Sequence, residues 1–451
     1  MTKRFFFISL LLAAFVWGFI THWNQYFPYQ IVNKAHIAYK ALMEVKNDQY
    51  REVVRKETLW YPIWEKSGLK RPTAKTFSPS RGNEKIFVLG DKRSLFDVCP
   101  KVGCLAWIID REGNVLHAWK NKPDLWTFRN TRKSPGYDTY PVCAHVYPNG
   151  DLLVNYHGNA TFPYAIGLAK FDKDSNLIWK KEEYYHHWFT VDSQGRILTP
   201  AIRLVQSPLE INDRKYKIKC EQGMITAEYI AILDPEGNKI KSIDLTTALN
   251  KSDLMSMLVN TKACDPFHLN MIDINEDPTR QSRVLGLGDL LISIRSMNTI
   301  GVLEKESDLF KWYFNGPLVR QHSSVFFNDS EIFVVDNAGG PQKKGTSRVV
   351  SINVDTNEIK TIFPRENVKL PTWDFFIQTG GFLTVYPDRS RMLVAFTYPS
   401  GFIWEIDIKT GEVLWEYRNI TPIEKVFLRI PIYTALYADN FNFPFNNGQV
   451  Q

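Results

Sequence analysis

A hairpin-like segment recurs six times along the chain, and this repeat constrains the fold more than any other feature. Each copy reads as two apolar strands around a turn such as Asp-x-x-Gly, and the period is roughly 40 to 55 residues. Aspartate and glycine accept the backbone angles of tight turns, so the two strands of each copy can pair. Short strands and turns repeated at this length predict an all-β fold, a six-bladed β-propeller. The copies begin at Trp107, Leu168, Tyr229, Thr299, Val349 and Phe402.

The repeat also sets the expected blade boundaries. We expect blades at about residues 84–120, 141–182, 186–246, 265–316, 320–364 and 375–418. A polar insert at residues 207–223 lengthens the third blade, and a short helix is expected at residues 246–259. The apolar and aromatic stretch at residues 425–445 is expected to pack against the propeller or to close the ring with a strand near residues 85–90.

The chain begins with a basic and then apolar segment, MTKRFFFISLLLAAFVWGFITHWNQYF. Lys3 and Arg4 before a long uncharged run predict a signal anchor or transmembrane helix within residues 1–30. The propeller would then be membrane-anchored and extracytoplasmic, in the periplasm if the source is Gram-negative. Residues 31–83 read as a helical stalk and a linker, and the stalk could serve as a homo-oligomer contact or pack on the propeller. The propeller is expected to occupy residues 84–451.

Composition and charge exclude several classes of function. Hydrophobic residues make up 44% of the chain and aromatic residues 14%, which is ample for stacked blades. The net charge of +7 comes from interspersed basic and acidic residues, unlike a nucleic-acid-binding surface. No glycine-rich phosphate loop occurs, so no nucleotide cofactor is expected. The five cysteines lack the CxxC spacing of zinc or redox sites, and export would permit disulfides, with Cys99 and Cys104 as the closest pair.

Four of the nine histidines open a segment that reads as histidine, a few residues, a turn and an apolar strand. The innermost strand of each propeller blade faces the central channel, so residues at one phase of the repeat converge there. The phase predicts a polar, histidine-rich centre. The structural alternative is that each histidine forms a hydrogen bond to a neighbouring blade. The four residues are His145, His187, His268 and His322.

The segment DPFHLNMIDINEDPTRQSRVLGLGDLLISIRSMNTI brings further polar residues to this centre. His268 and Asn270 share one face of a strand, because side chains two residues apart point the same way. Arg295 closes the next strand, and Gln321-His322 opens the following inner strand. A guanidinium among imidazoles would repel a metal dication, whereas its fork of donors suits the oxygens of sulfate or phosphate.

At these residues the chain resembles the bacterial arylsulfate sulfotransferase family, the arylsulfotransferases. The resemblance runs from about Val142 to Tyr417. It rests on the order of several short motifs on a six-bladed pattern. These are His-His after Tyr185, His-x-Asn at His268, the ISIRSMN strand, Gln-His at His322, and the stretches at residues 336–340 and 347–355.

The resemblance implies an enzyme, an aryl sulfotransferase. Members of the family move a sulfuryl group from an aryl sulfate to a phenolic acceptor without phosphoadenylyl sulfate, by a ping-pong scheme through a sulfated histidine. It implies His322 as the nucleophile and no cofactor. The implied catalytic partners are His268, Arg295 and His187.

Three further residues are candidates for substrate binding. The family resemblance implies a binding role for Asn270. His145 is a candidate because it belongs to the four histidines at one phase of the repeat. Trp188 is a candidate for stacking on an aryl ring, with core packing as its alternative. Trp188 after His187 and Ser323 after His322 depart from the family pattern, which leaves the donor and acceptor open.

Two alternatives from other classes remain at this point. Other propellers place four inner-strand histidines around Fe(II), so the four histidines could form a non-haem iron site. Arg295 in the same channel argues against that site. The second alternative is a non-catalytic periplasmic propeller that serves as a scaffold.

Overall fold

The computed structural model divides the chain into two compact units, Met1–Trp60 and Tyr61–Gln451. In the first unit, helix α1 spans Thr2–Asn24. The sequence predicts a membrane-spanning helix in this segment, whereas no helix among the described residues is both long and apolar enough to cross a membrane. Most of the predicted stalk lies outside the described residues. These are residues 2–24, 60–62, 73–78, 82–91, 94, 99, 102–126, 139–158, 162–211, 216–218, 220, 223–260, 264–337, 347–366, 368–370, 375, 377–397, 401–423, 426–438 and 441–446.

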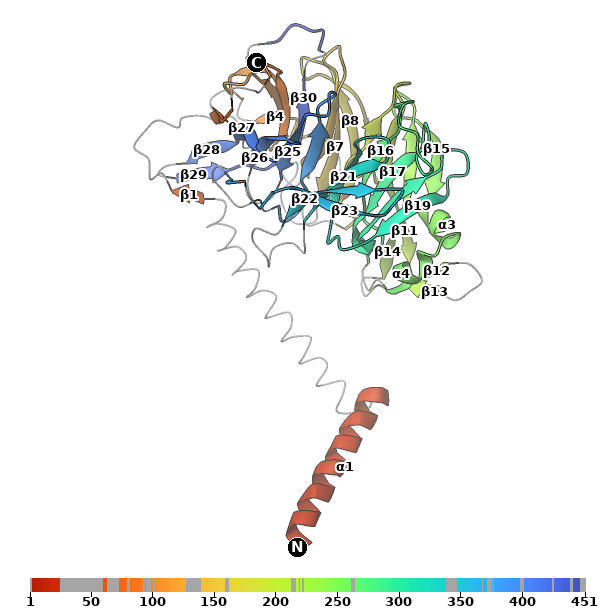
Figure 1. Ribbon diagram of the computed structural model, residues 1–451. Helices are drawn as coiled ribbons and strands as arrows, with labels where there is room; N and C mark the ends of the chain where they lie inside the picture. Colours follow the sequence, from red (N-terminus) through yellow and green to blue (C-terminus); the bar gives the residue numbers. More distant parts are fainter. Residues whose placement is uncertain are drawn as a thin grey trace. The chain divides into compact units, whose positions relative to one another are not determined.

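The second unit is an all-β, six-bladed propeller, as the repeat predicts (Figure 1). Each blade is an antiparallel sheet, and its strands are given from the inner strand outward. Blade 1 contains β30 (Ile432–Tyr437), β3 (Ile86–Gly90), β4 (Cys104–Ile109) and β5 (Val115–Lys120). Blade 2 contains β6 (Thr139–Val146), β7 (Leu152–Gly158), β8 (Ala165–Phe171) and β9 (Leu177–Lys181). Blade 3 contains β10 (Thr190–Val191), β11 (Ile197–Gln206), β14 (Met224–Leu233) and β15 (Lys239–Asp244).

The other three blades follow the same order. Blade 4 contains β16 (Leu269–Ile274), β17 (Leu290–Ile294), β18 (Thr299–Leu303) and β19 (Phe310–Asn315). Blade 5 contains β20 (His322–Phe326), β21 (Glu331–Asp336), β22 (Arg348–Asn353) and β23 (Ile359–Phe363). Blade 6 contains β24 (Phe382–Val385), β25 (Arg391–Phe396), β26 (Phe402–Asp407) and β27 (Val413–Arg418), with β2 (Thr73–Thr76) on its outer edge.

Segments from the two ends of the propeller sequence close the ring. Strand β30 supplies the inner strand of blade 1 and pairs with β3, with Ile86 opposite Tyr437. The predicted closure by residues 425–445 is therefore confirmed for β30. Buried Glu405 of blade 6 accepts hydrogen bonds from Arg111, which follows β4, at 3.0 Å. This ion pair joins the last blade to the first.

Smaller elements decorate the blades. The predicted insert in blade 3 contains the hairpin of β12 (Leu209–Ile211) and β13 (Tyr216–Ile218). One helix was expected after this blade, but two short ones form, α3 (Leu245–Asn250) and α4 (Met255–Asn260). A turn at Ser252, whose hydroxyl accepts from Leu254 N–H, separates them. Strands β28 (Ile420–Ile423) and β29 (Val426–Arg429) form a hairpin, and β1 spans Trp60–Pro62. Disulfides join Cys99 to Cys104 and Cys220 to Cys264.

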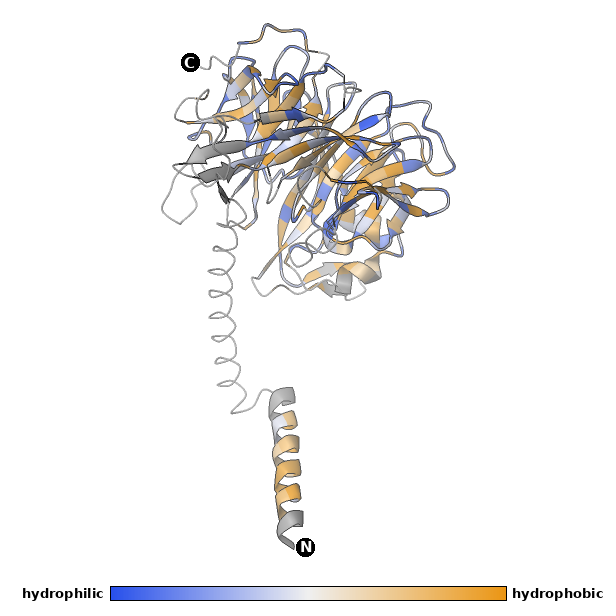
Figure 2. Cartoon of the chain, turned by 60° about the vertical axis from the view of Figure 1, so that its left-hand side comes forward, coloured by the Kyte–Doolittle hydropathy of each residue, from blue (hydrophilic) through white to orange (hydrophobic). Residues whose placement is uncertain are grey.

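Apolar side chains fill the spaces between the blades. Hydrophobic residues line the strands, and the connecting turns are mostly hydrophilic (Figure 2). The tryptophans Trp107, Trp119, Trp404 and Trp415 are fully buried. The inner strands run in the same direction around the ring, so their first residues gather at one end of the central channel and their last residues at the other.

Buried His117 of β5 makes stability depend on pH. Its Nε2 lies 3.0 Å from the Lys173 carbonyl, and its Nδ1 accepts from Asn446 N–H at 3.2 Å. Burial lowers the pKa of His117 to about 4 from 6.5. Between pH 6.5 and 4 the imidazole of His117 is therefore protonated in the unfolded chain but neutral in the folded chain. The free energy of unfolding consequently falls as the pH is lowered through this range.

We expect His117→Gln to make the free energy of unfolding less dependent on pH between 6.5 and 4. One such histidine contributes a slope of up to about 1.4 kcal/mol per pH unit. Urea unfolding of both proteins across this range measures the slope. Equal slopes would show that His117 does not carry this linkage.

Candidate active site

Three predicted histidines gather where the inner strands begin. His187 lies just before β10, His268 just before β16, and His322 is the first residue of β20. The backbone is left-handed at His187 (φ 52°) and at His268 (φ 55°). Such conformations cost about 1 kcal/mol or more at residues other than glycine, and they concentrate at functional sites. The sequence thus holds two imidazoles in an unfavourable backbone geometry at the same place.

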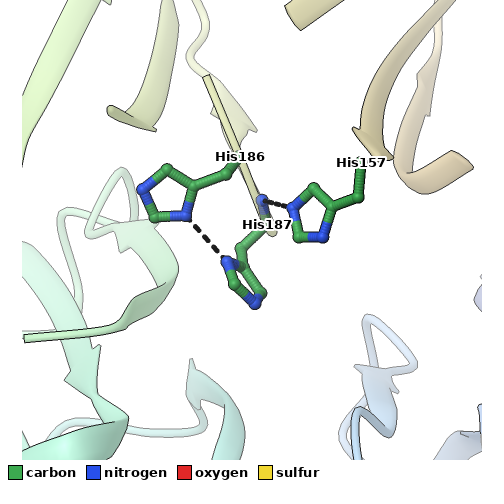
Figure 3. A group of neighbouring side chains, drawn as sticks. All are labelled: His157, His186 and His187. Atoms are coloured by element: carbon green, nitrogen blue, oxygen red, sulfur yellow. Dashed lines mark hydrogen bonds between the residues drawn. The ribbon is translucent and has the colours of Figure 1, made fainter. Parts of the chain in front are cut away.

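Two histidines that the repeat did not single out join this group. Figure 3 shows His157, from the end of β7, beside the neighbours His186 and His187. The Nδ1 atoms of His186 and His187 lie 2.7 Å apart, so one donates to the other. The backbone N–H of His187 donates to His157 Nε2 at 3.0 Å. Burial lowers the pKa of all three imidazoles, that of His186 to about 3, so they are neutral near pH 7.

These three imidazoles are also the residues best placed to hold a metal ion among those that the structure describes. One nitrogen atom of each lies within 4.8 Å of the others. Neutral imidazoles are the usual ligands of zinc and of several transition metals. In the present arrangement, however, hydrogen bonds within the group already engage one nitrogen of each ring.

An aspartate orients His268. The Nδ1 of His268 lies 2.5 Å from Asp265 Oδ2, and the Thr226 hydroxyl donates to Asp265 Oδ1 at 2.9 Å. The Tyr164 hydroxyl donates to the same Oδ2 at 3.3 Å. Burial would raise the pKa of Asp265, but the charge and hydrogen bond of His268 hold it well below its usual range. An ionised carboxylate on Nδ1 leaves His268 Nε2 for proton transfer and stabilises the imidazolium.

A second carboxyl group lies behind the histidines. Glu228 accepts the backbone N–H of Leu269, and its Oε1 lies 3.7 Å from His186 Nε2. Burial, followed by the charge of Asp265, raises the pKa of Glu228 well above its ordinary value. Glu228 therefore holds its proton more readily than Asp265 does, and Asp265 is the more readily ionised of the two carboxyl groups.

Asn337 fixes the orientation of His322. The amide nitrogen of Asn337 donates to the carbonyls of Ile377 and Gly380 at 2.8 and 3.1 Å. Its Oδ1 therefore faces His322 Nδ1, at 2.7 Å, and accepts the proton on that nitrogen. The lone pair of His322 is then on Nε2. Burial, and next the charge of Arg295, lower the pKa of His322 to about 3, so this lone pair is free near pH 7.

We expect Asn337→Ala to lower the turnover of the site about 10- to 100-fold, because His322 can then adopt the other tautomer. Asn337→Asp keeps the acceptor oxygen and adds a negative charge, which raises the pKa of His322. It should retain more activity than the alanine variant and move the acid limb of the pH profile to higher pH. Equal losses and unshifted profiles in both variants would contradict this orienting role.

Arg295 brings a positive charge close to His322. It begins the 3-10 helix η1 (Arg295–Met297), and its backbone N–H donates to the His268 carbonyl at 3.0 Å. Among the described residues its Nε is buried without a hydrogen-bond partner. Nearby Asn270 donates to the Gln321 carbonyl at 2.8 Å, and its Oδ1 is likewise unpartnered within the described chain. The Nε of Arg295 can therefore donate to a ligand, and the Oδ1 of Asn270 can accept from one.

Trp188 lies against the nucleophile candidate rather than in an open space. Its indole meets the His322 ring edge to face, with ring centres 5.6 Å apart, and stacks on Phe382 at 6.2 Å. Only 2% of Trp188 is exposed. The structure therefore favours the core-packing alternative, in which Trp188 supports His322 from behind.

His145 does not reach this site, and the prediction that its phase matches the other histidines is wrong. It lies near the far end of β6, against Tyr147, and borders a cavity with Asp273 and Phe326, which lie at the far ends of β16 and β20. The reason is spacing. His145 precedes its turn at Asn149 by four residues, whereas His322 precedes the turn at Asn328 by six.

Comparison with known proteins shows what this chain is similar to. A model of the family described as arylsulfotransferase (ASST) matches residues 144–399, more than half of the chain. A protein of unknown function from Bacteroides caccae is similar in structure at 10% identity and a TM-score of 0.44, covering 74% of this chain and 93% of its own. Virginiamycin B lyase from Staphylococcus aureus is similar at 12% identity and a TM-score of 0.36, covering 65% and 80%. No curated protein sequence matches the chain. The family match over residues 144–399 shows that the chain belongs to the arylsulfotransferase family.

Proposed function

We propose that this protein transfers a sulfuryl group from an aryl sulfate to a phenol through a sulfated His322. The observation that carries the proposal is the state of His322. It is buried and neutral, its Nδ1 bonds to Asn337, and its Nε2 lone pair remains beside the charge of Arg295. A neutral imidazole is a competent nucleophile.

In the first half-reaction, Nε2 of His322 attacks the sulfur of the aryl sulfate. The bond between sulfur and the aryl oxygen breaks, and the sulfuryl group remains on Nε2. The aryl oxide leaves and takes a proton from the His268 imidazolium. Arg295 stabilises the negative charge on the sulfuryl oxygens in the transition state, an electrostatic contribution that is commonly large.

In the second half-reaction, a phenol replaces the departed aryl alcohol. Neutral His268 takes the phenol proton, and Asp265 stabilises the imidazolium that forms. The phenol oxygen attacks the sulfur, the bond between sulfur and Nε2 breaks, and His322 returns to its neutral state. The proton lost in the first half-reaction is thereby recovered.

We also propose that the protein acts outside the cytoplasm. The two disulfides, Cys99–Cys104 and Cys220–Cys264, support an extracytoplasmic site of action, because such bonds persist in oxidising compartments. The basic and then apolar start of the sequence fits an export signal.

Steady-state kinetics of the purified protein test the proposed reaction. With 4-nitrophenyl sulfate as donor and phenol as acceptor, we expect release of nitrophenolate and equimolar formation of phenyl sulfate. A ping-pong scheme predicts parallel lines in double-reciprocal plots at several phenol concentrations. Release of inorganic sulfate alone would indicate a hydrolase, and the absence of any product would contradict the proposal.

A second candidate function is metal-assisted chemistry, and one observation favours it. His157, His186 and His187 place three neutral imidazole nitrogens within 4.8 Å of one another. This set replaces the four channel histidines considered from the sequence, because His145 lies at the other end of the channel. Metal analysis of the purified protein, beside His157→Gln, separates the candidates. If the parent protein binds one equivalent of iron or zinc and the variant does not, the result favours metal chemistry. If the parent protein binds no metal, the result contradicts this second candidate function.

A further inference from the structure

A cavity lies at the opposite end of the central channel from His322. Its volume is about 510 Å³, which is within the usual range for small-molecule sites. Residues from the far ends of the inner strands border it, among them His145, Asp273, Phe326 and Leu436. Phe382 also borders it and stacks on Trp188, so apolar side chains separate this cavity from the site of His322.

Two polar groups at this cavity make no hydrogen bond within the part of the chain that the structure describes. The His145 imidazole is half-buried and makes no hydrogen bond within the described residues, and burial lowers its pKa to about 4. Its ring is therefore neutral and offers one acceptor and one donor. The buried Nε of Arg280 makes no hydrogen bond within the described chain, and its ion-pair partner is the Asp277 carboxylate at 3.6 Å. A molecule with hydrogen-bonding groups in the cavity could therefore bond to His145, and Arg280 could donate to it beside its ion pair.

The charges that border the cavity balance. Arg280 and Arg389 both approach the Asp277 carboxylate, at 3.6 and 3.1 Å. The fourth charged side chain is Asp273, whose Oδ2 accepts the backbone N–H of Phe326 at 3.1 Å. Two guanidinium groups and two carboxylates leave no excess of either sign. A neutral ligand therefore fits this cavity better than an anion or a cation does.

Aromatic side chains form much of the remaining wall. Phe189, Phe326, Phe327 and Phe382 all border the cavity. Aromatic walls favour a ring-containing ligand through stacked or edge-to-face contacts. We propose that this cavity is a second binding site, for a neutral hydroxylated aromatic molecule whose hydroxyl group bonds to His145 or Asp273. The proposal does not depend on the sulfuryl-transfer proposal, because it uses none of the residues around His322.

Crystals soaked in 4-bromophenol test this site directly, because anomalous scattering locates the bromine. We expect a bromine peak in the cavity between His145 and Phe326. In solution, His145→Phe and Arg280→Gln should each weaken binding of the same probe to this site at least tenfold. Arg203→Gln serves as the control, since Arg203 pairs with Asp244 on blade 3.

Two results would overturn the proposal. One is a bromine peak only near His322, or none at all, in crystals of the parent protein at saturating probe. The other is a peak in the cavity that persists with unchanged occupancy in both variants. If either result appears while nitrophenolate release continues, the second site fails and the sulfotransferase proposal stands.

Discussion

Replacement of His322 by asparagine is expected to lower kcat for sulfuryl transfer by at least about 10⁴-fold, as loss of a nucleophile does in other covalent mechanisms. Asparagine keeps a polar side chain at the position but supplies no nitrogen lone pair that can attack sulfur. Both half-reactions pass through His322 Nε2, so both should fail. Nitrophenolate release and phenyl sulfate formation from the purified variant measure the loss.

The control for this variant is another buried histidine outside the site. His117→Gln removes an imidazole from β5, which contributes no residue to the site, and should retain kcat near pH 7. If His322→Asn retained most of the parent activity, the nucleophile would have to be a different residue, and the reaction scheme would be wrong at its first step.

Replacement of Arg295 by glutamine is expected to lower kcat about 100- to 1,000-fold, with a smaller effect on KM. The guanidinium acts on charge that builds up on the sulfuryl oxygens in the transition state. Its loss should therefore affect the chemical step more than binding of the donor. Arg295→Lys restores the charge without the planar fork of donors, and we expect it to recover part of kcat.

A distant arginine supplies the matched comparison. Arg203 pairs with Asp244 on the surface of blade 3, and Arg203→Gln should leave kcat unchanged. A rise in KM with unchanged kcat in Arg295→Gln would contradict the assigned role, because it would mean that Arg295 binds the donor equally in the ground and transition states.

The blades could be predicted from the sequence because their signals are local. Each copy of the repeat carries its own turn and its own pair of apolar strands, so neighbouring strands are specified within about 15 residues. The pairing of β3 with β30 has no such local signal. Strand β30 lies more than 300 residues away, and only the need to complete the first blade connects the two. The sequence indicated this closure as one of two alternatives, without its register.

The candidate site was predicted less completely than the fold. His187, His268 and His322 were found because they occupy one phase of the repeat, but His145 was placed with them on a spacing that differs by two residues. His157 was missed because it lies on a second strand rather than an inner one. The repeat signals which strand a residue occupies, and it cannot show which side chains from different strands meet.

The sequence analysis did not identify the residues that orient the histidines, although each lies close to a histidine or to its strand in the sequence. Asp265 stands three residues before His268, and Asn337 follows the strand that pairs with β20. Neither spacing is distinctive without the three-dimensional arrangement. The neutral state of His322 depends on burial and on the charge of Arg295, and both arise only when distant segments fold together.

The most direct test of the central claim is the intact mass of the protein, followed by peptide mapping, after rapid mixing with 4-nitrophenyl sulfate in the absence of a phenol. The account predicts a gain of one sulfuryl group, located on His322, that disappears when phenol is added and is absent from His322→Asn. Formation of phenyl sulfate without any adduct, or with an adduct on another residue, would contradict it.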